Sequence, residues 1–249
     1  AICVYNADKY IVETLKSVMN QTFQGFNLLF VDDSSTDRSV ALVERFFQEN
    51  PRQYELVRFD ENRGIGYARH FAERHAKTKY MMFLDSDDIL YPDAVEKMYV
   101  KIKSDEDLMA VGCYLEYIDG RGKKLGGGLF LGETIKEEFY KKAEKGKLIF
   151  MQPTAIYDRD VALSVGGYVI DGYPEGKPRY QDYCEDLDLW TRMSDLYAEG
   201  KAIVVVPEVL CKYRKGGGLS SSTFYMSIKM RYTKTNVRRR RRGEGDLTF

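Results

Sequence analysis

The feature that most constrains the fold of this chain is the alternation of strand-like and helix-like segments over residues 1–117. Strands separated by amphipathic helices favour βαβ units with right-handed crossovers. We therefore predict an α/β protein with a mostly parallel, twisted sheet flanked by helices. The predicted strands are residues 1–5, 26–31, 55–59, 80–84 and 108–117, and the predicted helices between them are residues 7–20, 35–47, 67–76 and 92–103.

The second half of the chain is less regular, and the composition shifts near residue 118. We expect residues 1–117 and 118–222 to be two halves of one domain, followed by a C-terminal helix and basic tail at residues 223–249. In the second half, the pattern predicts helices at 133–145 and 185–197, strands at 148–157 and 202–206, a turn region at 118–128 and a long loop at 166–183.

Charge is balanced overall but uneven along the chain. Lys and Arg together number 38, as do Asp and Glu, so no global field attracts nucleic acid and no such partner is expected. A run of five arginines near the C-terminus is usually a solvated, disordered tail, and the alternative is a peripheral contact with anionic lipid. The run comprises Arg238, Arg239, Arg240, Arg241 and Arg242.

Cysteine usage and hydropathy indicate a cytoplasmic protein, at the inner face of the membrane if the arginines bind lipid. The four cysteines lack metal-site or redox-motif spacing, which fits a reducing compartment. No apolar run approaches the roughly 18–20 residues that span a bilayer, and no signal peptide is visible. Because the sequence starts without Met inside a predicted strand, we expect a few residues to precede it naturally.

Two carboxylate clusters follow predicted strands. Asp85, Asp87 and Asp88 come directly after residues 80–84, and the pair Asp32–Asp33 follows residues 26–31. Ligands of open parallel sheets bind at the carboxyl ends of the strands, and Mg²⁺ combines one or two carboxylates with phosphate oxygens. The stretch "DSDD" is therefore half of a metal–diphosphate site or a helix-capping turn, and the second acidic cluster favours the site.

Several motifs together carry a resemblance to a known family. The dinucleotide-binding sequence G-x-G-x-x-G and the Walker A sequence are both absent from the chain. The segments that carry the resemblance are "VYNADKYIVETLKSVMNQTF", "LLFVDDSSTDRS", "ENRGIGYARHFAERHA", "YMMFLDSDDILYPDAVEKM" and "YCEDLDLWTRM". In this order they resemble the family 2 glycosyltransferases of the GT-A fold. The resemblance implies a Rossmann-like nucleotide half at 1–117, an acceptor half at 118–222, and transfer of a sugar from a nucleoside diphosphate with inversion, using Mg²⁺ or Mn²⁺.

The resemblance also implies roles for individual residues. Tyr5 matches the aromatic residue beside the nucleobase, Asp33 the acid that hydrogen-bonds the base, and Asp186 the catalytic base. A carboxylate at Asp33 that accepts an imide N–H favours a uridine or thymidine donor. The full implied site consists of nucleotide-binding Cys3, Tyr5, Asp33, Arg69, Asp85 and Ser86, metal-binding Asp87 and Asp88, and catalytic Asp186 and Glu185.

The sequence departs from the family pattern at two histidine positions. His70 replaces the usual Asn after Arg69, and "YRKGGGLSSS" lacks the His that many members use near the metal or diphosphate. Arg214, Lys215 and the loop at 216–222 could contact the diphosphate instead. Trp190, one helical turn after Asp186, could stack on a sugar or lie in the core.

The expected function is therefore transfer of a sugar, with a UDP-sugar favoured, to a carbohydrate or lipid-linked hydroxyl in polysaccharide or glycolipid synthesis. One alternative is a sugar-nucleotide nucleotidyltransferase, although "YNADKY" lacks the Gly-rich, basic loop that holds a triphosphate. Another alternative is a catalytically silent protein that binds a nucleotide or sugar. The intact Glu185–Asp186 pair argues against a catalytically silent protein. The absence of a histidine from "YRKGGGLSSS" argues for one.

Overall fold

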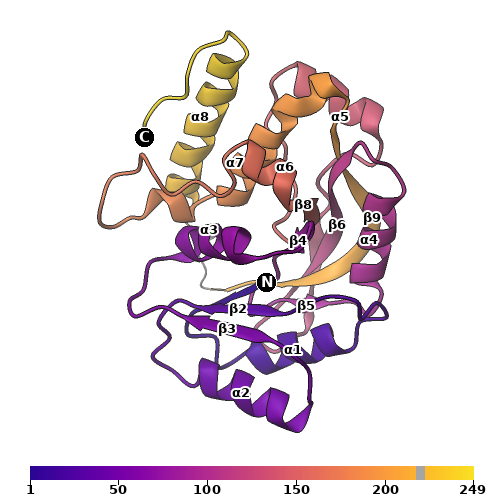
Figure 1. The fold of residues 1–249 in the computed structure, drawn as a ribbon, viewed down its shortest axis with the longest axis vertical. Coiled ribbons are helices and arrows are strands. Elements are labelled where there is room, and N and C mark those ends of the chain that lie inside the picture. The colour runs from indigo at the N-terminus through magenta and orange to yellow at the C-terminus, as the bar shows by residue number, and fades with distance from the viewer. Residues whose placement is uncertain (217–221) are drawn as a thin grey trace.

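The computed structural model describes residues 1–216 and 222–249. Its first part is a parallel sheet with one helix layer on each face (Figure 1), as the sequence predicts. Helices α1 and α2 cover one face, and α3 lies on the other. The strands are β1 (Ile2–Val4), β2 (Leu29–Asp32) and β3 (Glu55–Arg58), and the helices are α1 (Ile11–Met19), α2 (Ser39–Glu49) and α3 (Ile65–His75).

The second sheet is mixed, so the prediction of a mostly parallel sheet is wrong there, while the α/β class is confirmed. Strands β6 and β9 pair in parallel, and the other pairs are antiparallel. The turn region at 118–128 contains part of a strand, and most of 148–157 is not strand. The sheet has the order β4 (Tyr80–Met82), β8 (Ile156–Asp158), β6 (Leu108–Ile118), β9 (Ala202–Arg214), β5 (Ile89–Leu90), with β7 (Lys124–Leu129) paired to β6.

The start of β1 links the two sheets. The amino group of Ala1 donates a hydrogen bond to the Met82 carbonyl at 2.6 Å, and the Leu84 N–H donates to the Ala1 carbonyl at 3.0 Å. This is the bonding pattern of adjacent parallel strands. The carboxyl ends of β1, β2 and β4 therefore meet at one edge, where the acidic clusters lie.

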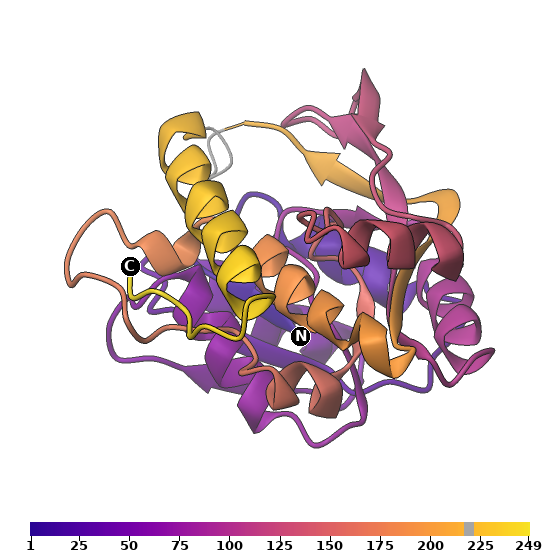
Figure 2. The same ribbon diagram turned by 90° about the horizontal axis from the view of Figure 1, so that it is seen from above.

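Helices of the second half pack on and beside the mixed sheet (Figure 2). The Thr233 hydroxyl of α8 donates to the Asp188 carboxylate of α7 at 3.1 Å, which holds these two helices together. Trp190 of α7 is fully buried against Tyr157, so it is a core residue and not a surface for sugar stacking. The helices of the second half are α5 (Lys136–Glu144), α6 (Arg159–Ser164) and α7 (Glu185–Met193), followed by α8 (Thr223–Arg240); the remaining helix of the first half is α4 (Ala94–Lys103).

The arginine run near the C-terminus is structured, so the interpretation as a disordered tail is wrong. Its first three residues belong to α8, and four of the five arginines form ion pairs within the protein. Arg240 and Arg241 both contact Asp195, at 2.5 and 3.1 Å. Lipid contact stays a prediction. Among the described residues, no helix has the length and apolarity needed to cross a bilayer.

Candidate active site

Asp33, at the end of β2, is bound by the turn at residues 62–64. Its carboxylate accepts hydrogen bonds from the backbone N–H groups of Arg63 at 2.7 Å and Gly64 at 2.8 Å, and from the Asn62 amide at 2.8 Å. Burial raises the pKa of the Asp33 carboxyl above its ordinary value. A nucleobase contact at Asp33 would use the lone pairs that these three donors leave.

The end of β1, whose Val4 carbonyl accepts the Asp33 N–H at 2.8 Å, is followed by an exposed aromatic ring. Tyr5 is 49% exposed, so it is not a core residue and its ring is available for stacking. The next residue, Asn6, has a positive φ of 49°, and its side-chain oxygen accepts a hydrogen bond from the Thr36 N–H at 2.8 Å. Cys3 is buried within β1, where burial raises the pKa of its thiol to about 12, so it supports the strand from inside.

Arg69 of α3 joins the acidic motif to the candidate catalytic helix. One end of its guanidinium donates to Asp85 at 2.6 Å, and the other donates to Glu185 at 2.6 Å. The Arg69 side chain is only 4% exposed. Burial works against its charge, but the carboxylates of Asp85 and Glu185 outweigh burial and raise the pKa of Arg69. Three segments thus meet in one ion triad, Asp85–Arg69–Glu185, in which the central Arg69 is buried and Asp85 is partly exposed.

The motif residues after Asp85 have different surroundings. Burial, followed by the charge of Asp85, raises the pKa of the Asp87 carboxyl to about 6. Asp88 is 2% exposed and accepts the backbone N–H of Arg214 at 2.9 Å, so this carboxylate anchors β9. The carbonyl of Ser86 accepts the Thr14 hydroxyl at 3.0 Å. Asp87 is therefore the better placed of the two candidate metal ligands.

Arg214 has partners within the protein, which argues against the expected contact with a diphosphate. Its guanidinium donates to the Asp87 carbonyl at 2.8 Å, to the Asp119 carbonyl at 3.0 Å and to Glu13 at 2.7 Å, and its side chain is 2% exposed. Lys215 lies 3.9 Å from the centre of the Tyr117 ring. Residues 217–221 of the expected loop lie outside the described residues.

The candidate catalytic acids begin α7. Cys184, just before the helix, has left-handed backbone angles with φ 50°, an unusual conformation for a residue with a side chain. Burial raises the pKa of both carboxyls that follow, Glu185 and Asp186. The carboxylate of Glu185 accepts a hydrogen bond from Arg69, whereas backbone N–H groups at the start of α7, those of Asp186 and Leu187, act on the carboxyl of Asp186 and oppose the effect of burial on its pKa. Of the two acids, Glu185 is therefore the one that Arg69 holds.

Sequence reasoning missed Asp182, which packs on the start of α3. Its carboxylate accepts the Gly66 N–H at 2.9 Å, and burial raises its pKa to about 6. A Cβ at Gly64 would lie 2.3 Å from an Asp182 oxygen, and one at Gly66 would lie 2.5 Å from the Gln181 carbonyl oxygen. The "GIG" stretch was the available signal, because two glycines at a helix start indicate close approach of another segment.

The histidine that departs from the family pattern is tied to the backbone. The Nδ1 atom of His70 lies 2.6 Å from the Tyr168 carbonyl oxygen, and burial lowers the pKa of the imidazole. This contact places His70 against the segment that follows Gly166–Gly167. The His70 ring thus helps to hold residues 166–168 against α3.

Comparison with known proteins identifies the family. The model of glycosyl transferase family 2 matches residues 1–165. This chain belongs to glycosyl transferase family 2. The matched range contains the candidate donor-site residues, and the acids of α7 lie beyond it.

Individual relatives of this glycosyltransferase agree with that membership. An uncharacterized glycosyltransferase of Haemophilus influenzae is 26% identical over 227 residues, which is 90% of this chain and 67% of that protein. Chondroitin synthase of Escherichia coli is 36% identical over 129 residues, which is 51% of this chain and 18% of that protein. The family predicted from the motifs is confirmed.

Solved structures confirm the predicted GT-A type fold. The structure of S. aureus TarS residues 1–349 in complex with UDP-GlcNAc matches with a TM-score of 0.67 at 22% identity, over 93% of this chain and 64% of that one. The glycosyltransferase chain thus spans about two thirds of this solved neighbour. At this identity the likeness describes the fold alone.

Proposed function

We propose that this chain transfers a sugar, with inversion, from a nucleoside diphosphate to an acceptor hydroxyl, and that the donor is a UDP-sugar. The observation that carries the proposal is the Asp85–Arg69–Glu185 triad. It joins the acidic motif after β4 to the first residue of α7, so a donor held at the motif lies beside the candidate base Asp186. The acceptor is proposed to be a carbohydrate or lipid-linked hydroxyl in polysaccharide or glycolipid synthesis.

The nucleoside half of the donor is proposed to lie between Tyr5 and Asp33. The exposed ring of Tyr5 offers a face for a base, and such stacking contributes roughly 1–3 kcal/mol. Asp33 has hydrogen-bond acceptors only, which suits the imide N–H of uracil. A fold neighbour solved with UDP-GlcNAc and a relative named chondroitin synthase support a nucleotide-sugar donor and a polysaccharide product.

Residues of the acidic motif fit a hard divalent cation. Asp85 and Asp87 offer carboxylate oxygens, the donors that Mg²⁺ and Mn²⁺ prefer. The repulsion between them, which helps raise the pKa of Asp87, is the electrostatic signature of a site that gains from a cation. Among residues 1–216 and 222–249, no group of three or more His, Cys, Asp or Glu side chains could hold a metal by itself. We therefore propose that Asp87, with Asp85, binds Mg²⁺ or Mn²⁺ together with the diphosphate.

The proposed reaction is a single displacement. The acceptor oxygen forms a bond to the anomeric carbon while the bond from that carbon to the diphosphate oxygen breaks, and the electron pair leaves with the diphosphate. Asp186 takes the proton of the acceptor hydroxyl at a carboxylate oxygen. Arg69 fixes the side chains of Asp85 and Glu185 on either side of this centre. When bound, the cation supplies Lewis-acid stabilisation of the departing charge.

The proposal is tested by incubating the chain with UDP-, dTDP-, GDP- and ADP-sugars in Mn²⁺ or Mg²⁺ and measuring release of nucleoside diphosphate. We expect slow hydrolysis or transfer with a UDP-sugar and none after Asp186→Asn. The matched control is Asp160→Asn, because Asp160 is an exposed acid in the first turn of α6. Tight UDP binding without any turnover would favour the silent binding protein instead.

A further inference from the structure

The turn at residues 62–64, which binds the Asp33 carboxylate, is itself bound by a loop of the second half. The guanidinium of Arg179 donates two hydrogen bonds to Asn62, to its side-chain oxygen at 2.6 Å and to its backbone carbonyl at 2.6 Å. The Asn62 amide in turn donates to the Asp33 carboxylate at 2.8 Å. Arg179, which is 117 residues from Asn62 in the sequence, therefore reaches Asp33 through one intermediate side chain.

The same loop also binds the segment that follows the turn. The Asp182 carboxylate accepts the Gly66 N–H at 2.9 Å, at the start of α3. The Asp182 N–H donates to the Arg179 carbonyl at 3.0 Å in a short 3₁₀ turn, which fixes the spacing of these two residues. We call Arg179 and Asp182 the loop clamp, because they bind Asn62 and Gly66, on either side of two residues whose N–H groups donate to Asp33.

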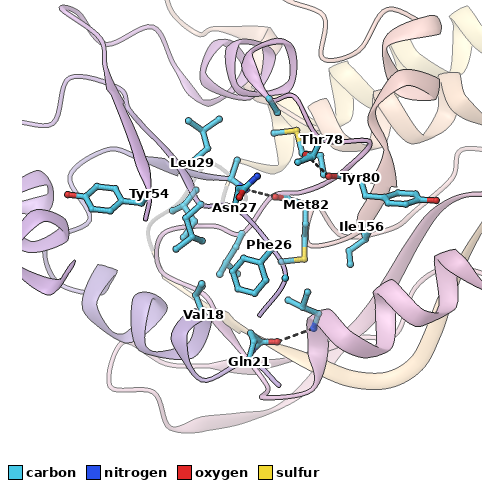
Figure 3. A pocket seen from close by; sticks show the side chains of 18 of the residues that line it. Val18, Gln21, Phe26, Asn27, Leu29, Tyr54, Thr78, Tyr80, Met82 and Ile156 are labelled. Carbon is cyan, nitrogen blue, oxygen red and sulfur yellow. Dashed lines mark hydrogen bonds between the residues drawn. The ribbon is translucent and has the colours of Figure 1, made fainter. Parts of the chain in front are cut away.

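The amino ends of the same strands have different surroundings. Figure 3 shows a cavity there, lined among others by Leu29 of β2 and by Tyr54, just before β3. The loop clamp binds at the carboxyl ends, where Asp33 follows β2. The base site and this cavity are therefore separate.

The chemistry of Arg179 fixes which way the Asn62 amide points. A guanidinium has donors only, so the side-chain oxygen of Asn62 faces Arg179 and the NH₂ group faces Asp33. A carboxylate has about four lone-pair sites, and the three donors of the turn take three of those on Asp33. The one site left suits a base edge with a single N–H, as in uracil, and not the adjacent N–H groups of guanine.

Charge supports the same arrangement. Burial raises the pKa of the Asp33 carboxyl, while the N–H groups of Arg63 and Gly64, and then the charge of Arg179, act in the opposite direction. Arg179 therefore favours the carboxylate form of Asp33, which is the form that only accepts hydrogen bonds.

We propose that Arg179 and Asp182 are positioning residues for nucleobase selection. They hold the turn at residues 62–64 so that Asp33 keeps a single acceptor site, and this site selects uracil over guanine. The inference rests on the proposed function, because it concerns the same base site. It adds that a loop of the second half sets the specificity for the donor, and that Arg179 acts through Asn62 without touching the nucleotide.

Calorimetry with UDP and GDP tests the loop clamp through Arg179. Arg179→Met should weaken UDP binding roughly tenfold, the size expected for a lost hydrogen bond to a charged group, and should reduce the preference for UDP over GDP. Arg179→Lys keeps the charge but not the planar fork that binds two oxygens of Asn62, so it should recover at most part of the affinity. The matched control is Lys177→Met, which removes a charge from an exposed position of the same loop and should bind UDP normally. Full recovery in Arg179→Lys, or equal binding by Arg179→Met and the control, overturns the proposal.

A double substitution distinguishes action through Asn62 from a direct contact with the nucleotide. If Arg179 acts through Asn62, the chain with both Asn62→Ala and Arg179→Met should bind UDP as well as the chain with Asn62→Ala alone. Additive losses of affinity would show that Arg179 contacts the nucleotide itself and would overturn the proposal.

Hydrogen exchange without nucleotide separates this inference from the proposed function. Arg179→Met should speed exchange at the amides of Arg63 and Gly64, which donate to Asp33, and Lys177→Met should not. If the unmodified chain binds no UDP, the proposed function fails, while faster exchange in Arg179→Met still supports the loop clamp. Unchanged exchange at both amides overturns the loop clamp even if UDP binds.

Discussion

Replacing Arg69 by Met should destabilise the fold strongly, because it leaves two carboxylates facing each other without their cation. The guanidinium makes two hydrogen bonds of 2.6 Å, to Asp85 and Glu185, and only 4% of its side chain is exposed. Breaking a buried ion pair from one side costs roughly 3–5 kcal/mol. For a chain of this size we expect Tm to fall by roughly 6–20 °C.

The pH dependence of that loss has a definite sign. Burial raises the pKa of Glu185 to about 8 even with Arg69 present, and removing the cation raises it further. Above pH 8 the folded variant therefore still binds a proton that the unfolded chain and the unmodified protein have released, so its stability deficit relative to the unmodified protein is nearly constant from pH 5 to 7 and grows as pH rises through 8. Adding Glu185→Gln to Arg69→Met should restore part of the lost stability, because Gln is neutral without binding a proton.

Urea unfolding and thermal melts at pH 5, 6, 7, 8 and 9 measure these effects. Arg45→Met is the matched control, since Arg45 forms an exposed pair with Glu49 on α2, with 74% of its side chain exposed. It should leave Tm unchanged. The reasoning is refuted if Arg69→Met melts within about 2 °C of the Arg45→Met control at pH 7. It is also refuted if the loss of stability of Arg69→Met relative to the unmodified protein becomes larger toward pH 5.

Three further outcomes follow from the site. Asp186→Asn should lower kcat by roughly 10²–10⁴-fold and leave the donor Kd unchanged, whereas the control Asp160→Asn should keep normal rates. Loss of donor binding in Asp186→Asn would show that Asp186 has a structural role. Because burial and Asp85 raise the pKa of Asp87 to about 6, Mn²⁺-dependent UDP affinity should fall about tenfold per pH unit below 6, and calorimetry giving a flat profile would contradict this. Tyr5→Ala should weaken UDP binding roughly 5–150-fold, and GDP binding more tightly than UDP in the same titrations would exclude the proposed base pocket.

The first half of the fold was predictable because its signals are local. A parallel strand covered on both faces consists of a continuous apolar run, as at residues 28–31, and the helices between such runs are amphipathic. The carboxyl ends of parallel strands share one edge, which predicts that Asp33 and Asp85 lie at the same edge of the sheet.

The second half was less predictable because its strands lack those signals. Strand β7 has the sequence "KLGGGL", and three glycines argue against a strand. Strand β9 continues through Pro207 to Arg214, although a proline normally marks a strand end, and its pairing with β6 shifts register in this region. The pairing partners of both strands decide their structure, and local sequence does not report those partners.

The side-chain network of the site depended on contacts between distant segments. Arg69 bridges Asp85 and Glu185, which lie 16 and 116 residues away, and no spacing rule predicts such a pairing. The same is true of Arg214, which binds internal carbonyl groups, and of Asp88, which accepts a backbone N–H from β9. The order of the motifs indicates which residues are candidates for the site. Only the fold distinguishes the candidates that anchor strands from those that are available to a ligand.

The most direct test of the central claim is a crystal structure of the chain with UDP and Mn²⁺. We expect the uracil beside Tyr5 and Asp33, Mn²⁺ on Asp87 with the diphosphate, and the Asp186 carboxylate facing the open side of the diphosphate. Nucleotide density anywhere else, with the acidic motif free of both metal and phosphate, would contradict the account.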